Sequence, residues 1–242
     1  MAIKVLVNGG SGRMGQEVIK AVSKDDALSL VGFVDVNDNL EEKIKELSPQ
    51  VVVDFTVPSA VYKNLMVIIN SGVCPVIGTT GLKEEEILEA KRICDEKKLG
   101  GLIAPNFAIG AVLLMEFAAK ASEYLPSVEI IELHHDQKID APSGTALKTA
   151  EKIAKNRGEY INNIDEKILD GARGAVYKDI HIHSVRLQGL VAHEEVLLGG
   201  VGQMLTIRHD SFNRESFMPG VIYACKKVVS LNALFYGLEE IL

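Results

Sequence analysis

Hydrophobic positions in the first hundred residues form short apolar runs, and each run is followed by a segment with helical periodicity. The apolar runs predict strands at Ile3 to Val7, Leu30 to Val34, Val51 to Phe55, Pro75 to Ile77 and Gly101 to Ile103. The segments between them predict helices at Arg13 to Val22, Glu41 to Leu47, Ser59 to Asn70 and Lys83 to Lys97. Strict alternation of strand and helix predicts a parallel, doubly wound sheet, and therefore an α/β fold.

The pattern changes after the middle of the chain. Strands are expected at Val128 to Leu133, Ile180 to Leu187, Glu194 to Leu198 and Met204 to Arg208, with Gly199 to Gly202 joining the last two as a hairpin. One helix is expected from Pro142-Ser143-Gly144-Thr145 to about Lys155, and helical spacing returns at Met218 to Val229 and Leu231 to Leu242. Fewer helices between strands predict an α+β region with a mixed or antiparallel sheet.

Composition and charge narrow the class of protein. A chain of 242 residues with 47% hydrophobic residues can bury one large or two modest cores. The net charge of -7 argues against a nucleic acid or an anionic membrane as a partner. Cys74, Cys94 and Cys225 are widely spaced and are expected to be reduced. The first apolar run is too brief for a signal peptide and no stretch approaches membrane-spanning length, so a cytoplasmic location is expected.

A glycine-rich motif follows the first predicted strand. Gly10-Ser11-Gly12-Arg13-Met14-Gly15 has the form G-x-G-x-x-G, and Asp35 ends the next predicted strand. Glycines there allow a pyrophosphate to approach the backbone, and the acid can bind a ribose 2'-hydroxyl. The alternatives are a plain glycine-rich turn and an ordinary turn acid. The cofactor-binding residues expected in this turn are Gly9, Gly10, Ser11, Gly12, Arg13 and Met14.

The residues after Asp35 bear on the choice of cofactor. Val36, Asn37 and Asp38 include no basic side chain to receive a 2'-phosphate. A carboxylate about 4 Å from that phosphate would cost several kcal/mol before solvent screening. We therefore expect NADH to be preferred and NADPH to be possible, because Arg13 or a nearby lysine could still reach the phosphate.

The segment Glu132 to Ala146 combines a possible proton donor with a possible anion site. His134 and His135 end a predicted strand, Lys138 follows, and Ser143-Gly144-Thr145 begins a predicted helix. An imidazole can donate a proton, while an ammonium and free helix N–H groups can bind a carboxylate. Taken singly, these residues could be a helix cap, a solvated lysine and a structural histidine.

Five segments together resemble one enzyme family. Besides the histidine segment, the matching stretches are Val7 to Gly15, Asp54-Phe55-Thr56-Val57-Pro58, Gly78-Thr79-Thr80-Gly81 and Ala104-Pro105-Asn106-Phe107. Their order resembles the 4-hydroxy-tetrahydrodipicolinate reductase family, also called dihydrodipicolinate reductase. The resemblance implies an oxidoreductase of the diaminopimelate route to lysine, with a Rossmann-like dinucleotide domain and an α+β substrate domain. It places the first in residues 1–106 and 213–242, and a substrate-binding and oligomerisation domain in residues 107–212.

The resemblance also assigns roles. It implies that His134 is the catalytic acid, that Lys138 is catalytic and binds a carboxylate, and that His135, Ser143, Gly144 and Thr145 bind the cyclic dicarboxylate. It adds to the cofactor site Phe55, Thr56, Gly78, Thr79, Thr80, Ala104, Pro105, Asn106 and Phe107. A homotetramer is implied. Ala108 departs from the family, in which serine is common at this position.

Other polar residues are interpreted more plainly. His181 and His183 share a strand face at a spacing compatible with a metal, but no third ligand follows in register, so no metal is expected. Arg186 is interpreted as a surface or interface residue. The alternative functions are a nicotinamide-dependent dehydrogenase of another small amino or dicarboxylic acid and a non-catalytic dinucleotide sensor.

Overall fold

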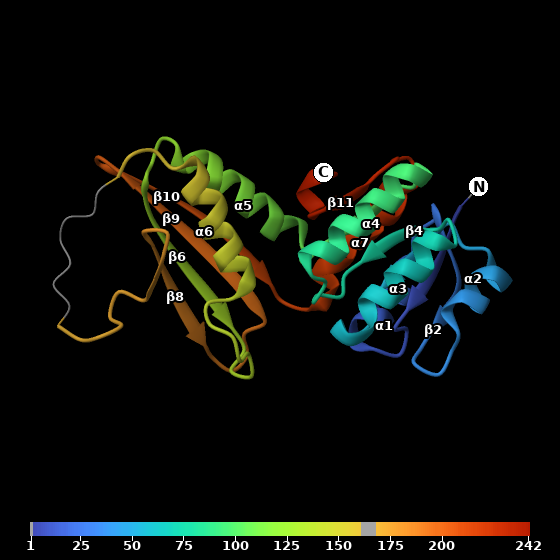
Figure 1. The fold of residues 1–242 in the computed structure, drawn as a ribbon. Coiled ribbons are helices and arrows are strands. Elements are labelled where there is room, and N and C mark those ends of the chain that lie inside the picture. Colours follow the sequence, from blue (N-terminus) through green and yellow to red (C-terminus); the bar gives the residue numbers. More distant parts are fainter. Residues whose placement is uncertain (1, 161–167) are drawn as a thin grey trace. The chain divides into compact units, whose positions relative to one another are not determined.

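The structure is a computed structural model that describes residues 2–160 and 168–242 (Figure 1). Its internal contacts divide the chain into two units. The first unit extends to Ile109 and includes Arg214–Leu242, and the second is Gly110–Asn213. No helix in these described ranges is both long and apolar enough to cross a membrane.

The first unit contains a six-stranded sheet in which all strands are parallel. Its order is β11 (Leu234–Tyr236), β5 (Gly101–Ile103), β4 (Cys74–Ile77), β3 (Val51–Asp54), β1 (Ile3–Asn8) and β2 (Leu28–Val34). Since β1 lies between β2 and β3, the direction of winding reverses there. Ligands of such sheets bind where the strands on either side of this reversal end. The predicted parallel α/β sheet is confirmed.

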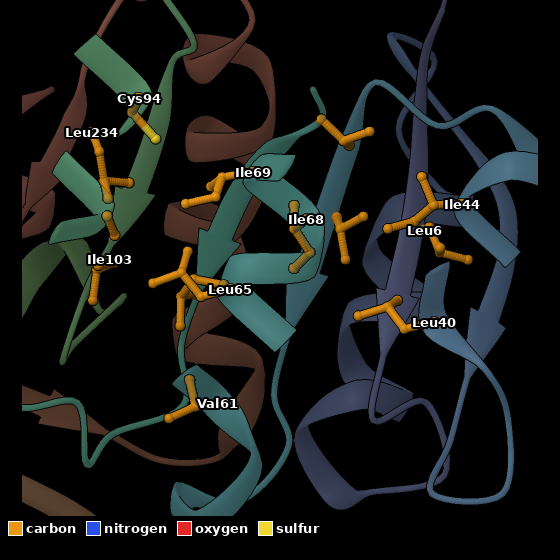
Figure 2. Close-up of a cluster of buried hydrophobic side chains, with 14 of the residues drawn as sticks. Leu6, Leu40, Ile44, Val61, Leu65, Ile68, Ile69, Cys94, Ile103 and Leu234 are labelled. Atoms are coloured by element: carbon orange, nitrogen blue, oxygen red, sulfur yellow. The ribbon is translucent and has the colours of Figure 1, made fainter. Parts of the chain in front are cut away.

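Helices pack on the sheet of the first unit in two groups. α1 (Arg13–Ser23) contacts α7 (Met218–Val228), whereas α2 (Leu40–Leu47), α3 (Pro58–Asn70) and α4 (Glu84–Lys97) contact one another in series. Figure 2 shows the core between the second group and the sheet, where side chains such as Leu6, Leu65 and Ile68 are fully buried. Val51, Val52 and Val53 are also fully buried, as expected for a strand covered on both faces.

The end of the chain corrects one prediction. Residues Leu231 to Leu242 were expected to be helical, but Leu234–Tyr236 form β11, which pairs with β5, and a short 3-10 helix follows at Leu238–Glu240. Leu234 and Leu238 are both buried. They lie four residues apart, a spacing that buried positions on a helix would also show. Gly237 separates them with a φ of 106°, which ends the strand in a conformation that favours glycine. Pairing with a distant strand therefore decided the local structure.

The second unit contains a five-stranded mixed sheet. Its order is β10 (Gln203–Ser211), β9 (Ala192–Gly200), β6 (Ser127–His134), β8 (Ile180–Arg186) and β7 (Ala175–Tyr177). β6 and β8 are parallel and the other neighbours are antiparallel. The mixed sheet and the β9–β10 hairpin are confirmed.

Two further elements were not predicted. α5 (Ile109–Ser122) is apolar on most of its surface, so it lacks the polar stripe that marks an amphipathic helix. β7 has only three residues, too few for a periodic signal. α6 (Gly144–Asn156) was predicted, and it packs on β6 and β8.

Candidate active site

The turn between β1 and α1 is built around close backbone approaches. Gly9 has a φ of 84°, and a Cβ there would lie 2.5 Å from the carbonyl oxygen of Phe55. A Cβ on Gly15 would lie 2.1 Å from the carbonyl oxygen of Gly9. Glycine is therefore required at both positions by the protein's own packing. Gly12, the N-cap of α1, is exposed and leaves the N-terminus of that helix accessible to an anion.

This turn borders a cavity of about 770 Å³ at the reversal point of the sheet. The lining comes from the ends of β1, β2 and β3 and from the helices that follow β2 and β3. The lining residues that were predicted to bind the cofactor are Gly9, Gly12, Asp35, Phe55 and Thr56. The size, the glycines and the helix N-terminus fit a dinucleotide.

Acidic side chains line the β2 end of this cavity. Asp35, Asp38 and Glu41 lie there, and Lys63 from α3 also borders the cavity. Asp35 accepts a hydrogen bond from the Ser11 N–H at 2.7 Å. Hydrogen bonding with the Ser11 side chain, and to a smaller extent with this N–H, lowers the pKa of the Asp35 carboxyl group. A carboxylate that remains ionised is suited to accept hydrogen bonds from ribose hydroxyls.

Asp54 organises the carboxyl ends of the strands, a role that was not predicted. Its buried carboxylate accepts hydrogen bonds from Asn8 Nδ2 at 2.7 Å, Asn64 Nδ2 at 2.9 Å and the Thr79 hydroxyl at 2.6 Å. It also accepts from the Thr56 N–H at 3.1 Å and the Thr56 hydroxyl at 2.8 Å. The one available signal in the sequence was an acid at the end of an apolar strand.

The remaining predicted cofactor residues lie elsewhere in the first unit. Gly78 packs on Phe55, since a Cβ at Gly78 would lie 2.1 Å from that ring. Thr79 is buried and bonded to Asp54, whereas Thr80 and Pro105 are exposed. Asn106 accepts a hydrogen bond from the Ala108 N–H at 2.9 Å. Ala104 and Phe107 are buried, and Arg13 and Met14 form the first turn of α1. Their contacts with a cofactor stay a prediction.

The candidate acid lies in the second unit, at the end of β6. Val128, Ile130, Glu132 and His134 alternate along one face of this strand, and the side chain of Glu132 is fully buried. His134 Nδ1 lies 2.5 Å from Glu132 Oε2, and the imidazole is 14% exposed. His135 lies beyond the strand and is exposed.

Arg186 completes this arrangement, a role that was not predicted; its side chain is 19% exposed, and its interpretation as an interface residue stays a prediction. Its guanidinium donates to both oxygens of Glu132, at 2.9 and 2.8 Å, and also to the carbonyl oxygen of Asp140 at 2.6 Å. Burial raises the pKa of Glu132, but hydrogen bonds from His134, Arg186 and Ser184 outweigh burial and lower that pKa to about 2. The Glu132–Arg186 contact was not predicted because the two residues lie on β6 and β8, which are neighbours in the sheet but more than fifty residues apart in sequence.

The loop after β6 carries the predicted anion site. Lys138 Nζ binds both carboxylate oxygens of Asp140 at 2.8 Å, and the N–H of Lys138 donates to the carbonyl oxygen of His135. Ser143 caps α6 by accepting a hydrogen bond from the Ala146 N–H at 3.1 Å. Gly144 and Thr145 form the first turn of α6, whose N–H groups have no acceptor within the helix. The segment therefore combines a cation with a helix N-terminus of the kind that can bind an anion, and its binding of a substrate carboxylate stays a prediction.

A second buried glutamate faces the first across the strands. Glu194 of β9 is in register with Glu132 of β6. Burial raises the pKa of Glu194 to about 7, the hydrogen bond with Thr149 opposes this shift, and the charge of Glu132 adds to it. Its Oε1 atom has no hydrogen-bond partner within the described residues.

The histidines considered for a metal are engaged in other contacts. His183 Nε2 lies 2.7 Å from Glu129 Oε2, and His181 Nδ1 lies 2.7 Å from the carbonyl oxygen of Arg173. Across residues 2–160 and 168–242, no three side chains of the metal-binding types gather at one point.

Comparison with known proteins decides the family. Residues 3–107 match the family model described as dihydrodipicolinate reductase, N-terminus, and residues 110–242 match its C-terminus. The chain belongs to the dihydrodipicolinate reductase family. A 4-hydroxy-tetrahydrodipicolinate reductase of Listeria welshimeri is 50% identical over 99% of this chain and 100% of the relative. One from Legionella pneumophila is 49% identical over 100% of both chains.

A solved dihydrodipicolinate reductase agrees with this assignment. The dipicolinate-bound enzyme of Paenisporosarcina sp. TG-14 is 44% identical and has a TM-score of 0.94, with 100% of both chains covered. The predicted family, fold class and oxidoreductase activity are therefore confirmed. Neither alternative function is favoured by these similarities.

Proposed function

We propose that this chain reduces 4-hydroxy-tetrahydrodipicolinate, or the dihydrodipicolinate formed from it, to tetrahydrodipicolinate in the diaminopimelate route of lysine biosynthesis. The observation that carries the proposal is the grouping of His134, Lys138 and the N-terminus of α6 on one short segment of the second unit. These groups are suited to donate a proton and to hold a carboxylate. A cytoplasmic location follows from a biosynthetic role of this kind.

The dinucleotide belongs in the cavity of the first unit. Gly9, Gly12 and the N-terminus of α1 would hold its pyrophosphate, and Asp35 would bind the adenosine ribose. When bound, the reduced nicotinamide supplies the hydride that is added to C4 of the substrate ring. The acidic lining of the cavity supports NADH as the preferred cofactor, with NADPH as a weaker one.

The second unit holds the dicarboxylate and supplies the proton. Lys138 exchanges the carboxylate of Asp140 for one of the substrate, and the first N–H groups of α6, with Ser143 and Thr145, bind the same group. His135 contributes to substrate binding. His134 donates a proton to the carbon beside C4, so that hydride and proton together saturate the double bond. When the hydrated substrate binds, Lys138 assists the loss of water.

The oligomer proposed for this chain is a homotetramer assembled through the sheets of the second unit. β10 is an edge strand, and exposed apolar side chains occur on it and on the preceding turn, at Val201, Met204 and Leu205. Edge strands with exposed apolar side chains are surfaces that proteins generally cover. Sedimentation equilibrium should give four times the mass of the chain, and a monomer at micromolar concentration would refute this part of the proposal.

The function is tested by oxidation of NADH, followed by its absorbance at about 340 nm. The unstable substrate is generated in the cuvette from pyruvate and aspartate semialdehyde by a synthase. NADH should be consumed only when the synthase and both of its substrates are present. Tight binding of NADH without consumption would refute the proposed reaction.

A further inference from the structure

A fully buried carboxylate lies beside the candidate acid in the second unit. Glu132 occupies the same strand face as Val128 and Ile130, where the alternation of β6 provides apolar positions. Removing a carboxylate from water is costly unless charged or polar groups pair with it. A buried acid with several well-placed partners is therefore a specific arrangement that calls for an explanation.

The contacts of Glu132 link it directly to His134 and Ser143 and, through Arg186, to the loop that carries Lys138. His134 Nδ1 lies 2.5 Å from Oε2, and the Ser143 N–H at the start of α6 donates to Oε1 at 3.3 Å. Arg186 bridges Glu132 to the carbonyl oxygen of Asp140, whose side chain holds Lys138. The Glu132 carboxylate thus connects the His134 imidazole, the loop that carries Lys138 and the N-terminus of α6.

We propose that Glu132, held by Arg186, is the positioning residue of the active site, and that it fixes the His134 ring with Nδ1–H toward Glu132 and Nε2 as the proton-donating atom. This inference rests on the proposed role of His134 as the acid. Nothing in it requires Glu132 to touch substrate or cofactor.

The charge state of Glu132 determines the tautomer. Two hydrogen bonds from the Arg186 guanidinium, which can only donate, favour the ionised form of Glu132, and its pKa is lowered to about 2. This carboxylate is therefore ionised at neutral pH and can only accept hydrogen bonds. The hydrogen between the two groups therefore belongs to Nδ1. Nε2 is then the ring nitrogen that can release and recover a proton. The same device, a buried acid that orients a histidine, serves catalysis in unrelated enzymes.

The tautomer can be measured directly in the unaltered protein. Two-bond ¹⁵N–¹H NMR of histidine-labelled protein, with His134 assigned by the His134→Gln variant, reports which nitrogen carries the hydrogen in the neutral ring. The proposal predicts Nδ1–H in the wild-type protein and a shift toward Nε2–H in Glu132→Gln, because the amide can donate to Nδ1. Nε2–H in the wild-type protein would overturn the proposal, even if Glu132→Gln failed to fold.

Kinetics provide the second test. Glu132→Gln should lower kcat by about 10- to 100-fold, within the range that a general acid contributes, and leave KM for NADH unchanged. Added to His134→Gln, it should lower kcat by less than about threefold, because residues that act as a unit are not additive. If Glu132→Gln lowered kcat in the His134→Gln background as much as it does in the wild-type protein, the proposal would be overturned.

Glu129→Gln is the matched control. Glu129 lies on the same strand and pairs with an arginine and a histidine, Arg173 and His183, but on the opposite face. It should retain wild-type kcat, with its assembly checked by sedimentation. If Glu132→Gln and Glu129→Gln lowered kcat equally, general destabilisation would explain the loss, and the positioning role of Glu132 would be overturned. If His134→Gln alone kept full activity while the tautomer was as predicted, the proposed acid would fail but the Glu132 contact would stand.

Discussion

Two buried glutamates on neighbouring strands of the second unit have pKa values shifted in opposite directions. Glu132 accepts hydrogen bonds from Arg186 and has a pKa of about 2, whereas Glu194 has a pKa of about 7 and an oxygen without a partner among the described residues. The residue type is the same and the strands are adjacent. The surrounding donors, rather than burial alone, therefore decide which of the two is fully ionised at neutral pH.

His134→Gln tests the proposed acid. Glutamine keeps a polar side chain but cannot donate a proton from a cationic ring, so kcat should fall roughly 10²- to 10⁴-fold with a much smaller change in KM. Steady-state kinetics with the coupled synthase assay measure both constants. His183→Gln, in which the lost histidine also pairs with a glutamate, should be unaffected. An unchanged kcat in His134→Gln would mean that water or another residue supplies the proton.

Glu194→Gln tests the raised pKa. In the folded protein Glu194 keeps a proton until about pH 7, whereas an ordinary glutamate loses it near 4.5. Its contribution to stability is complete below the lower value and is lost as pH rises through the higher one. Relative to wild type, the variant's free energy of unfolding should therefore rise between pH 5 and 8, by about 3 kcal/mol at most. Urea unfolding at several pH values measures the free energy of unfolding of both proteins. A difference between them that does not change with pH would contradict the raised pKa.

At the scale of elements, we propose that the turn after β2 governs the choice of cofactor. It places Asp35 and Asp38 on the cavity lining, beside Glu41 at the start of α2. We expect kcat/KM to be higher with NADH than with NADPH, and Asp35→Asn to reduce this preference by roughly tenfold, or about 1.4 kcal/mol. Asp26→Asn, an exposed acid outside the cavity lining, is the control. A clear preference of the wild-type enzyme for NADPH would contradict the account.

Element type was predictable from sequence where a local pattern dominated. The β1–α1–β2 unit could be predicted because apolar runs, glycines and helical spacing are all local signals. β11 could not, because its strand exists through pairing with β5, more than a hundred residues earlier. α5 was missed for the opposite reason, since its nearly uniform apolar surface gives no periodic contrast.

The candidate site shows the same division between local and distant signals. His134, Lys138 and Ser143 could be predicted because they share one short segment. Arg186 and Asp54 could not, because their roles depend on partners from other strands and helices. A charged residue in an alternating strand is normally assigned to the solvent face, and that rule fails where a buried acid positions other groups.

At the scale of the whole molecule, the first unit is assembled from two distant parts of the chain. α7 packs against α1, and Lys226 Nζ binds Asp25 at 2.6 Å. Periodicity predicts a helix near residue 218 but not the element against which it packs. The two-unit organisation therefore depends on long-range contacts that hydrophobic patterns alone do not reveal, and only the family resemblance pointed to it.

We propose that hydride passes from a dinucleotide held by the first unit to a dicarboxylate held by the second. Transfer from NADH deuterated at C4 of the nicotinamide tests this claim most directly, with each of the two C4 epimers used separately and the product analysed by mass spectrometry. We expect a single deuterium in tetrahydrodipicolinate from one epimer and none from the other. Product free of deuterium with both epimers would contradict the account.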